Sequence, residues 1–251
     1  MTKCAFFCRG AVLLLLLLVS GLTTAQDEGR QIEQVRKSLA LLLPNVLPES
    51  IRATPIANIY EVVVGARLVY VTGDGRYLIE GEITDLEQQR SLTIPRLNAV
   101  TAAAVDAIGE QNMLIFEPPG KRRHTVSVFT DIDSAYSRKL QQEMGQYLRQ
   151  GIRIRYLFYP RAGLESASFE KAVAVWCSKD RQHALERAVA GEPVVAESCP
   201  NPVRRHWELA SRMGISGAPV MLLENGELLP GYVSAERLFE ILEKMQRLKP
   251  P

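Results

Sequence analysis

The sequence predicts an α+β protein built from two domains behind an amino-terminal leader, and three observations support this organisation. The first 25 residues combine a basic head, an apolar run and small residues. A β-rich stretch interrupted by glycines lies between residues 59 and 83, and strands alternate with helices from residue 112 onwards. A composition of 47% hydrophobic and 23% charged residues is typical of folded globular chains.

The leader has the three parts of a secretory signal peptide. A basic head with Lys3 and Arg9 precedes about nine apolar residues from Ala11 to Val19, and small residues ending at Ala25 suit cleavage. A membrane-spanning helix needs about 20 apolar residues, so we expect residues 1–25 to be removed after export. An uncleaved membrane anchor is the alternative, and it also places the domains outside the cytoplasm.

Charge gives no sign of a nucleic-acid partner. The formal net charge of +2 falls to zero once the leader, with two basic residues and no acidic ones, is removed. No basic stripe with interleaved aromatic residues appears, and nucleic-acid binding relies on such a stripe. The three histidines, His124, His183 and His206, are far apart and have no metal-ligand spacing, so we expect no metal and no cofactor.

Residues 26–93 predict a small first domain. Apolar residues at helical spacing predict a helix over 31–43, which Pro44 ends. Three β-rich runs separated by Gly65 and by Gly73 to Gly75 predict an antiparallel sheet, with strands over 59–64, 66–72 and 77–83. A domain of this size has little core, so pairing with a second copy through an edge strand is our hypothesis.

Residues 94–111 predict a linker helix and residues 112–251 a second domain. The Ala-rich run over 96–108 has no internal Pro or Gly. The second domain begins with strand, helix and strand, an order that calls for a parallel pair. The full set is strands over 113–117, 124–130, 152–159, 219–224 and 228–232, with helices over 134–150, about 169–189, before Met213 and over 235–248. This order predicts a thioredoxin-like domain with a helical insertion.

Two cysteines remain once Cys4 and Cys8 leave with the signal peptide. Cys177 and Cys199 are 22 positions apart, and in an oxidising compartment such a pair is most simply a structural disulfide. Closing this loop would contribute about 3 kcal/mol of stability. Two free thiols and a redox-active pair are the alternatives.

Three segments of the second domain carry a family resemblance. They are Val128 to Ser137, Trp176-Cys177 together with Cys199, and Gly214 to Pro219. In order and spacing they resemble the DsbC/DsbG family of periplasmic disulfide isomerases and chaperones, and the resemblance covers nearly the whole mature chain. It implies a periplasmic, V-shaped homodimer. Cystatin-like amino-terminal domains would pair through sheet edges, and the thioredoxin-like domains would face an uncharged cleft that holds misfolded polypeptides.

The resemblance also implies roles for individual residues. Cys177 and Cys199 match the family's structural disulfide, and Pro219 matches a cis-proline that presents backbone groups to a bound extended polypeptide. Tyr136 matches a family tyrosine, and Tyr136, Ala218 and Pro219 are therefore our candidate substrate-binding residues. The resemblance implies no membrane association apart from export.

The redox motif is where the sequence departs from the family. The family has a Cys-X-X-Cys motif at the start of the first long helix, where the helix amino terminus stabilises a thiolate. Here Ser134 and Ser137 occupy the two positions. A hydroxyl neither forms a disulfide nor ionises readily, so we expect no redox catalysis and interpret Ser134 as a helix cap. A serine hydrolase is disfavoured because no base or Gly-X-Ser-X-Gly elbow accompanies the serines.

The function that follows is polypeptide binding of the chaperone type without redox activity. Two alternatives stay open. One is an active thiol:disulfide isomerase, either because the serines were introduced into the chain or because Cys177 and Cys199 act. The other is a module dedicated to a single protein partner.

Overall fold

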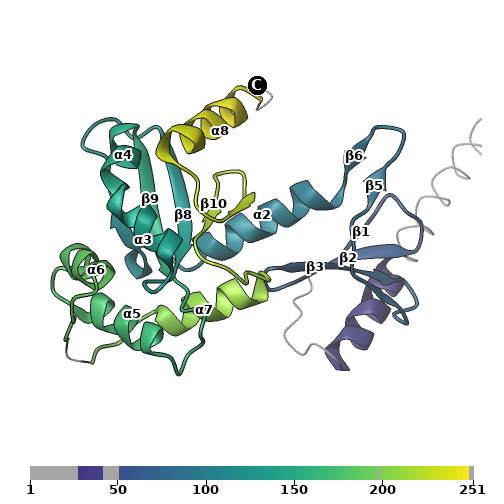
Figure 1. The fold of residues 1–251 in the computed structure, drawn as a ribbon. Helices are drawn as coiled ribbons and strands as arrows, with labels where there is room; N and C mark the ends of the chain where they lie inside the picture. Colours follow the sequence, from purple (N-terminus) through teal and green to yellow (C-terminus); the bar gives the residue numbers. More distant parts are fainter. Residues whose placement is uncertain (1–27, 42–50, 197, 249–251) are drawn as a thin grey trace, which may run out of the picture. The chain divides into compact units, whose positions relative to one another are not determined.

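The computed structural model describes residues 28–41, 51–196 and 198–248, in two compact units that divide after Thr84 (Figure 1). The predicted signal peptide, with Cys4 and Cys8, lies outside the described residues, as does the end of the first predicted helix. None of the described helices is long and apolar enough to cross a membrane.

The first unit packs one helix against a four-stranded antiparallel sheet. The helix is described over residues 28–41, and Val35 and Leu39 on its apolar face are buried with Val62 and Val71 of the sheet. The strands follow the order β1-β2-β3-β4 and are β1 (Ile51–Ala53), β2 (Ile59–Val64), β3 (Arg67–Thr72) and β4 (Leu78–Ile79).

The prediction of a long third strand over 77–83 is wrong. Only Leu78 and Ile79 pair with β3, opposite Val71 and Tyr70. Both side chains are about half exposed, so this segment lacks the buried face that would stabilise a longer strand pairing. A short ribbon of β5 (Thr84–Asp85) and β6 (Arg90–Ser91), which the sequence does not announce, follows instead.

The second unit is built on a five-stranded sheet with the order β11-β10-β8-β9-β7. The strands are β7 (Leu114–Phe116), β8 (His124–Thr130), β9 (Ile152–Phe158), β10 (Val220–Leu222) and β11 (Leu228–Pro230). The pair β8 and β9 is parallel, as the strand-helix-strand order predicts, and the other pairs are antiparallel. Nearly every residue of β8 and β9 is buried, because both faces of the sheet are covered.

Eight helical segments accompany this sheet in the described part of the second unit. They are α2 (Thr93–Asp106), the 3₁₀ turn η2 (Glu110–Asn112), α3 (Ala135–Gln142), α4 (Met144–Arg149), α5 (Ala167–Cys177), α6 (Arg181–Val189), α7 (Val203–Arg212) and α8 (Ala235–Leu248). The insertion of α5, α6 and α7 separates β9 from β10. This is the α+β organisation that the sequence predicts.

The single helix predicted over 134–150 is two helices. The chain leaves helical geometry at Glu143, with φ −95° and ψ 6°. Its carboxylate accepts a hydrogen bond from the Tyr232 hydroxyl, and the Tyr147 hydroxyl donates to the Val233 carbonyl at 2.5 Å. These bonds to the loop before α8 fix the break, which hydrophobic spacing alone does not announce.

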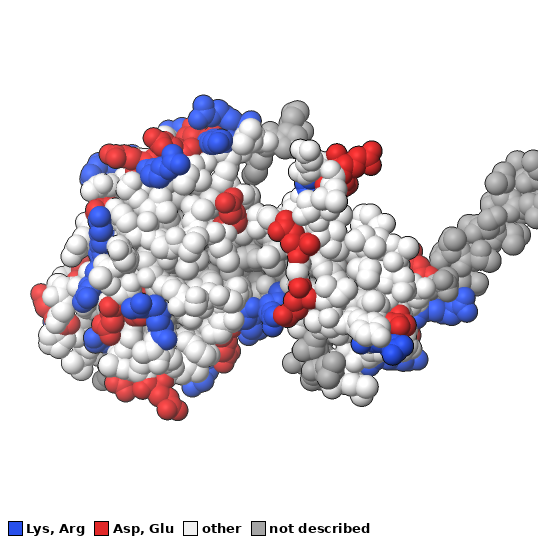
Figure 2. All heavy atoms as spheres, turned by 45° about the vertical axis from the view of Figure 1, so that its right-hand side comes forward, with Lys and Arg blue, Asp and Glu red and all other residues white. Residues whose placement is uncertain are grey.

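Ion pairs hold the end of α2 and the η2 turn against β9. Arg155 Nη2 lies 3.2 Å from Asp106 Oδ1, and Arg153 binds Glu110 through both of its terminal nitrogens. The hydrogen bond from Arg153 lowers the pKa of Glu110 to about 2. Basic and acidic side chains are interspersed on the surface shown in Figure 2, and broad areas of the larger unit there carry neither.

Candidate functional site

Ser134 caps helix α3 at the point where β8 ends. Its backbone is extended, with φ −78° and ψ 126°, and its Oγ accepts from the Ser137 backbone N–H at 3.4 Å. The preceding turn is closed by a hydrogen bond of 3.0 Å from the Ser134 N–H to the Asp131 carbonyl. Ser137 Oγ in turn accepts from the Asp131 N–H at 3.3 Å. Both serine side chains therefore complete the hydrogen bonding of one turn.

The same turn is joined to a loop 84 residues further along the chain. The peptide bond between Ala218 and Pro219 is cis, which confirms the geometry expected for Pro219. Ser134 Oγ donates to the Ala218 carbonyl at 2.7 Å. Ser134 and Ser137 are each only 3% exposed. The fold thus places the Ser134 hydroxyl against the cis-proline loop, with both of its hydrogen-bonding roles used inside the protein.

Tyr136 lies in the first turn of α3, and its side chain is 63% exposed. Exposed aromatic rings of this size are suited to contact with another chain. The structure places Tyr136, Ala218 and Pro219 on elements that Ser134 ties together, and their role in substrate binding stays a prediction.

A buried acidic residue, Asp131, lies in the turn that precedes Ser134. Asp131 is 3% exposed, and its carboxylate accepts from Arg161, Ser168 and the Asp133 N–H. Burial raises the pKa of Asp131, but hydrogen bonds from Ser168 and Arg161 outweigh it and hold the pKa below the ordinary value. The available signal was an acidic residue directly after a buried strand.

A groove of about 460 Å³ runs beside the cis-proline. Its lining consists of the loop from Met213 to Val220, of Leu228, Pro230 and Gly231, and of Arg161. The Tyr159 hydroxyl donates to the Ile215 carbonyl at 2.6 Å and fixes the loop to the end of β9. The Pro219 carbonyl accepts from the Gly231 N–H at 2.8 Å, which fixes the loop to β11.

No described histidine is placed to activate a serine. His124 starts β8, and Ser134 follows the far end of this seven-residue strand, about 20 Å away. His124 Nε2 instead lies 2.8 Å from Glu243 Oε1. His206 Nδ1 accepts from the Phe158 N–H at 3.1 Å, and burial lowers the pKa of His206 to about 4. The described residues also contain no cluster of side chains that would hold a metal ion.

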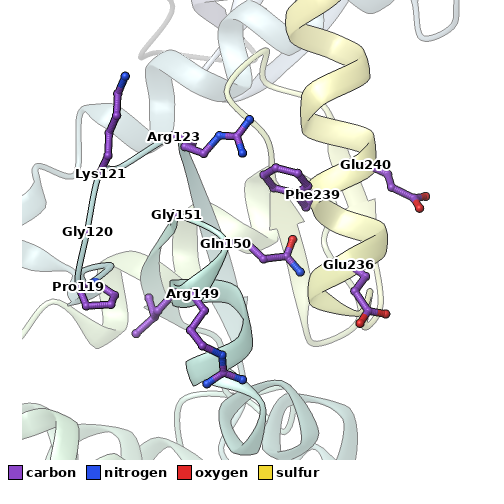
Figure 3. A pocket seen from close by; sticks show the side chains of 11 residues that line it. Pro119, Gly120, Lys121, Arg123, Arg149, Gln150, Gly151, Glu236, Phe239 and Glu240 are labelled. Carbon is purple, nitrogen blue, oxygen red and sulfur yellow. The ribbon is translucent and has the colours of Figure 1, made fainter.

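A second hollow, of about 760 Å³, lies at the start of β8 and beside α8 (Figure 3). Its charged side chains do not converge: Glu236 and Glu240 point outwards from α8, and Lys121 and Arg149 extend in opposite directions (Figure 3). Arg123 covers the Phe239 ring at 4.5 Å and pairs with Glu243. This arrangement defines no ligand, so the groove beside Pro219 is the candidate site.

Comparison with known proteins identifies the family. A model described as the disulfide bond isomerase protein N-terminal domain matches residues 23–94, and a thioredoxin-like domain model matches residues 111–246. The thiol:disulfide interchange protein DsbC of Salmonella typhimurium is 33% identical over 93% of this chain and 94% of its own length. The chain belongs to the DsbC family. The DsbC of Escherichia coli K12 is 31% identical over the same shares.

Among solved structures, a disulfide interchange protein from Neisseria gonorrhoeae is 28% identical, with a TM-score of 0.49. The match covers 55% of this chain and 98% of the Neisseria chain. DsbC proteins are thus named for exchange between thiols and disulfides, and this member has hydroxyl groups at the start of α3.

Cys177 and Cys199 form a disulfide in this DsbC-family chain, as the sequence predicts. Their Cα atoms are 5.6 Å apart, and the bond joins the last residue of α5 to the segment before α7. Both residues are partly buried against the main core of the second unit. These are the only cysteines among the described residues, so no free thiol lies in that part of the chain.

Proposed function

We propose that this DsbC-family protein binds unfolded or misfolded polypeptides in the periplasm and does not exchange disulfides at the start of α3. One observation carries the proposal. The Ser134 hydroxyl is buried and bonded to the Ala218 carbonyl, while the groove beside Pro219 is open to a ligand. The Ser134 oxygen therefore supports the loop that borders the groove, and no reactive sulfur is present at this position.

Binding needs no thiol. An extended polypeptide is held by backbone hydrogen bonds and by apolar contacts, and both are available without the cysteines. The groove is lined largely by apolar side chains and glycines, including Met213, Ile215 and Leu228. Exposed Tyr136 adds an aromatic contact on the neighbouring helix.

The family match supports two further parts of the proposal. The match over residues 23–94 to a disulfide isomerase amino-terminal domain supports homodimerisation through the first domain. The signal-peptide pattern of residues 1–25 supports export to the periplasm. A dimer places two grooves on one molecule, which raises the effective affinity for a long unfolded chain.

Active thiol:disulfide interchange is the second candidate, because the curated relatives of this chain carry that name. In the described residues such exchange would have to proceed through Cys177 and Cys199. An attacking client thiolate would break that disulfide, form a mixed disulfide with one cysteine and release the other as a thiolate; a second client thiolate would then displace the first cysteine, which leaves the client oxidised and both protein cysteines reduced. The partly buried position of the bond among core residues disfavours this attack.

Two assays on the mature protein separate the candidates. We expect it to suppress aggregation of a chemically denatured client and to leave a scrambled-disulfide client unrepaired. Repair of the scrambled client at a catalytic rate would contradict the main proposal. Repeating that assay with Cys177→Ala/Cys199→Ala would show whether the remaining pair is responsible. Recovery of one dominant bound protein from periplasm, with no general suppression of aggregation, would favour a dedicated partner-binding module.

A further inference from the structure

The groove beside Pro219 has one charged side chain in its lining. That side chain is Arg161, and every other lining residue is apolar, glycine or Ser216. A cation among otherwise uncharged lining residues is an unusual feature for a site that would accept any unfolded chain, because charged donors that face a groove discriminate between ligands. Arg161 lies three positions beyond the end of β9, and its backbone N–H is held by the Asp131 carboxylate.

The Arg161 side chain is anchored at its inner end and free at its outer end. Its backbone N–H and its Nε donate to Asp131 Oδ2 at 3.2 and 2.9 Å. Within the described residues, its two terminal nitrogens donate to no other group, and the side chain is 44% exposed. A guanidinium carries five N–H donors in a rigid plane, so four remain available to a ligand.

The charge that balances Arg161 is not accessible to a ligand in the groove. Asp131 is 3% exposed, and its other oxygen already accepts from Ser168 and from the Asp133 N–H. An incoming group therefore meets the donors of a cation while the counter-ion lies beneath it. A carboxylate is the ligand group that matches a planar guanidinium best.

We propose that Arg161 makes the groove selective for polypeptide segments that carry an acidic side chain flanked by apolar residues. This inference rests on the proposed polypeptide binding and adds a substrate class to it. The apolar flanks fill the walls formed by the cis-proline loop and β11, and the carboxylate pairs with the terminal nitrogens of Arg161. A basic side chain at the same place is repelled.

Three fluorescent peptides test the inference with the mature dimer. They share one apolar, extended sequence and differ only in a central Glu, Gln or Lys. We expect the Glu peptide to bind about two- to fivefold more tightly than the Gln peptide, as for a partly exposed ion pair. The Lys peptide should bind more weakly than the Gln peptide, and the differences should shrink at 1 M salt.

Variants separate this pairing from general effects of charge and folding. Arg161→Gln should remove the preference for Glu, so that the Glu and Gln peptides bind this variant with affinities within about twofold of each other. Because this variant leaves Asp131 without its partner, Asp131→Asn/Arg161→Gln provides a second version without the buried charge. Arg149→Gln is the matched control, since Arg149 is an exposed arginine in the other hollow, and it should keep the preference.

Each outcome has a defined meaning. Equal affinity for the Glu and Gln peptides in the parent protein would overturn the inference and leave the proposed function standing. Persistence of the preference in both Arg161 variants would also overturn it. Failure to bind any of the three peptides would contradict polypeptide binding itself, and the inference would fall with it.

Discussion

Two links in the second unit connect distant segments by different chemistry. At the start of α3 a hydroxyl joins Ser134 to Ala218 through a hydrogen bond of 2.7 Å. In the insertion a covalent bond joins Cys177 to Cys199. Sulfur is thus present where it ties one loop into the core, and the start of α3 carries the hydroxyl oxygens of Ser134 and Ser137. The comparison teaches that a covalent bond joins the two segments of the insertion, whereas a hydrogen bond joins the start of α3 to the cis-proline loop.

The largest effect should come from placing sulfur at the start of α3. We expect Ser134→Cys/Ser137→Cys to raise disulfide exchange from background to a catalytic rate, measured with a scrambled-disulfide client. The helix amino terminus has no acidic residue in its first turn and stabilises a thiolate there. Adding Cys177→Ala/Cys199→Ala should keep the gain. No gain in either form would show that the scaffold has lost more than its thiols.

Removing the other link should affect stability and not binding. Cys177→Ala/Cys199→Ala should lower the free energy of unfolding by about 3 kcal/mol, because the unfolded chain regains the freedom of the closed loop. Urea denaturation of the second unit measures this loss, and the melting temperature should fall by about 6–12 °C. Unchanged affinity for the Gln peptide is the matching control. A loss below about 1 kcal/mol would argue against a structural disulfide.

Acid should weaken the packing of the insertion that carries the disulfide. Burial lowers the pKa of His206 to about 4, and its ring packs on Trp176, the neighbour of Cys177. As the pH decreases, the unfolded state takes up a proton on His206 before the folded state does. The free energy of unfolding therefore keeps this contribution above about pH 6.5 and loses it as the pH decreases towards 4. The loss between pH 6.5 and 5 should be about 1.5 kcal/mol.

The denaturation of His206→Gln between these pH values checks this assignment. The variant should lose that part of the pH dependence, whereas His183→Gln, at an exposed histidine of α6, should keep it. An unchanged slope in His206→Gln would assign the pH dependence to other groups.

The smallest effect distinguishes the Ser134 link from an ordinary helix cap. Ser166 caps α5 in the same way, accepting from the Phe169 N–H and donating to the nearby Gly163 carbonyl. Both Ser134→Ala and Ser166→Ala should cost about 1–2 kcal/mol. Only Ser134→Ala should also weaken binding of the Gln peptide, because it releases the loop beside the groove. Equal binding by both variants would reduce Ser134 to a cap.

Local sequence patterns accounted for much of the fold. The limits of β8 and α8 follow from hydrophobic periodicity and turn residues, and the parallel pairing of β8 with β9 follows from the order of elements. The break at Glu143 and the shortness of β4 did not follow. The break depends on Tyr232, which is remote in the chain, and the shortness of β4 depends on the exposure of its side chains. Hydrophobic periodicity records neither.

For the candidate site, the sequence by itself determined the chemistry that is possible. It placed oxygen at positions 134 and 137 and sulfur at positions 177 and 199, and no fold changes the atoms that a side chain carries. Only the tertiary structure decided how those atoms are used. It brought Ser134 to Ala218 and buried Asp131 under Arg161, because contacts across 84 and 30 positions arise from the packing of sheet and loops.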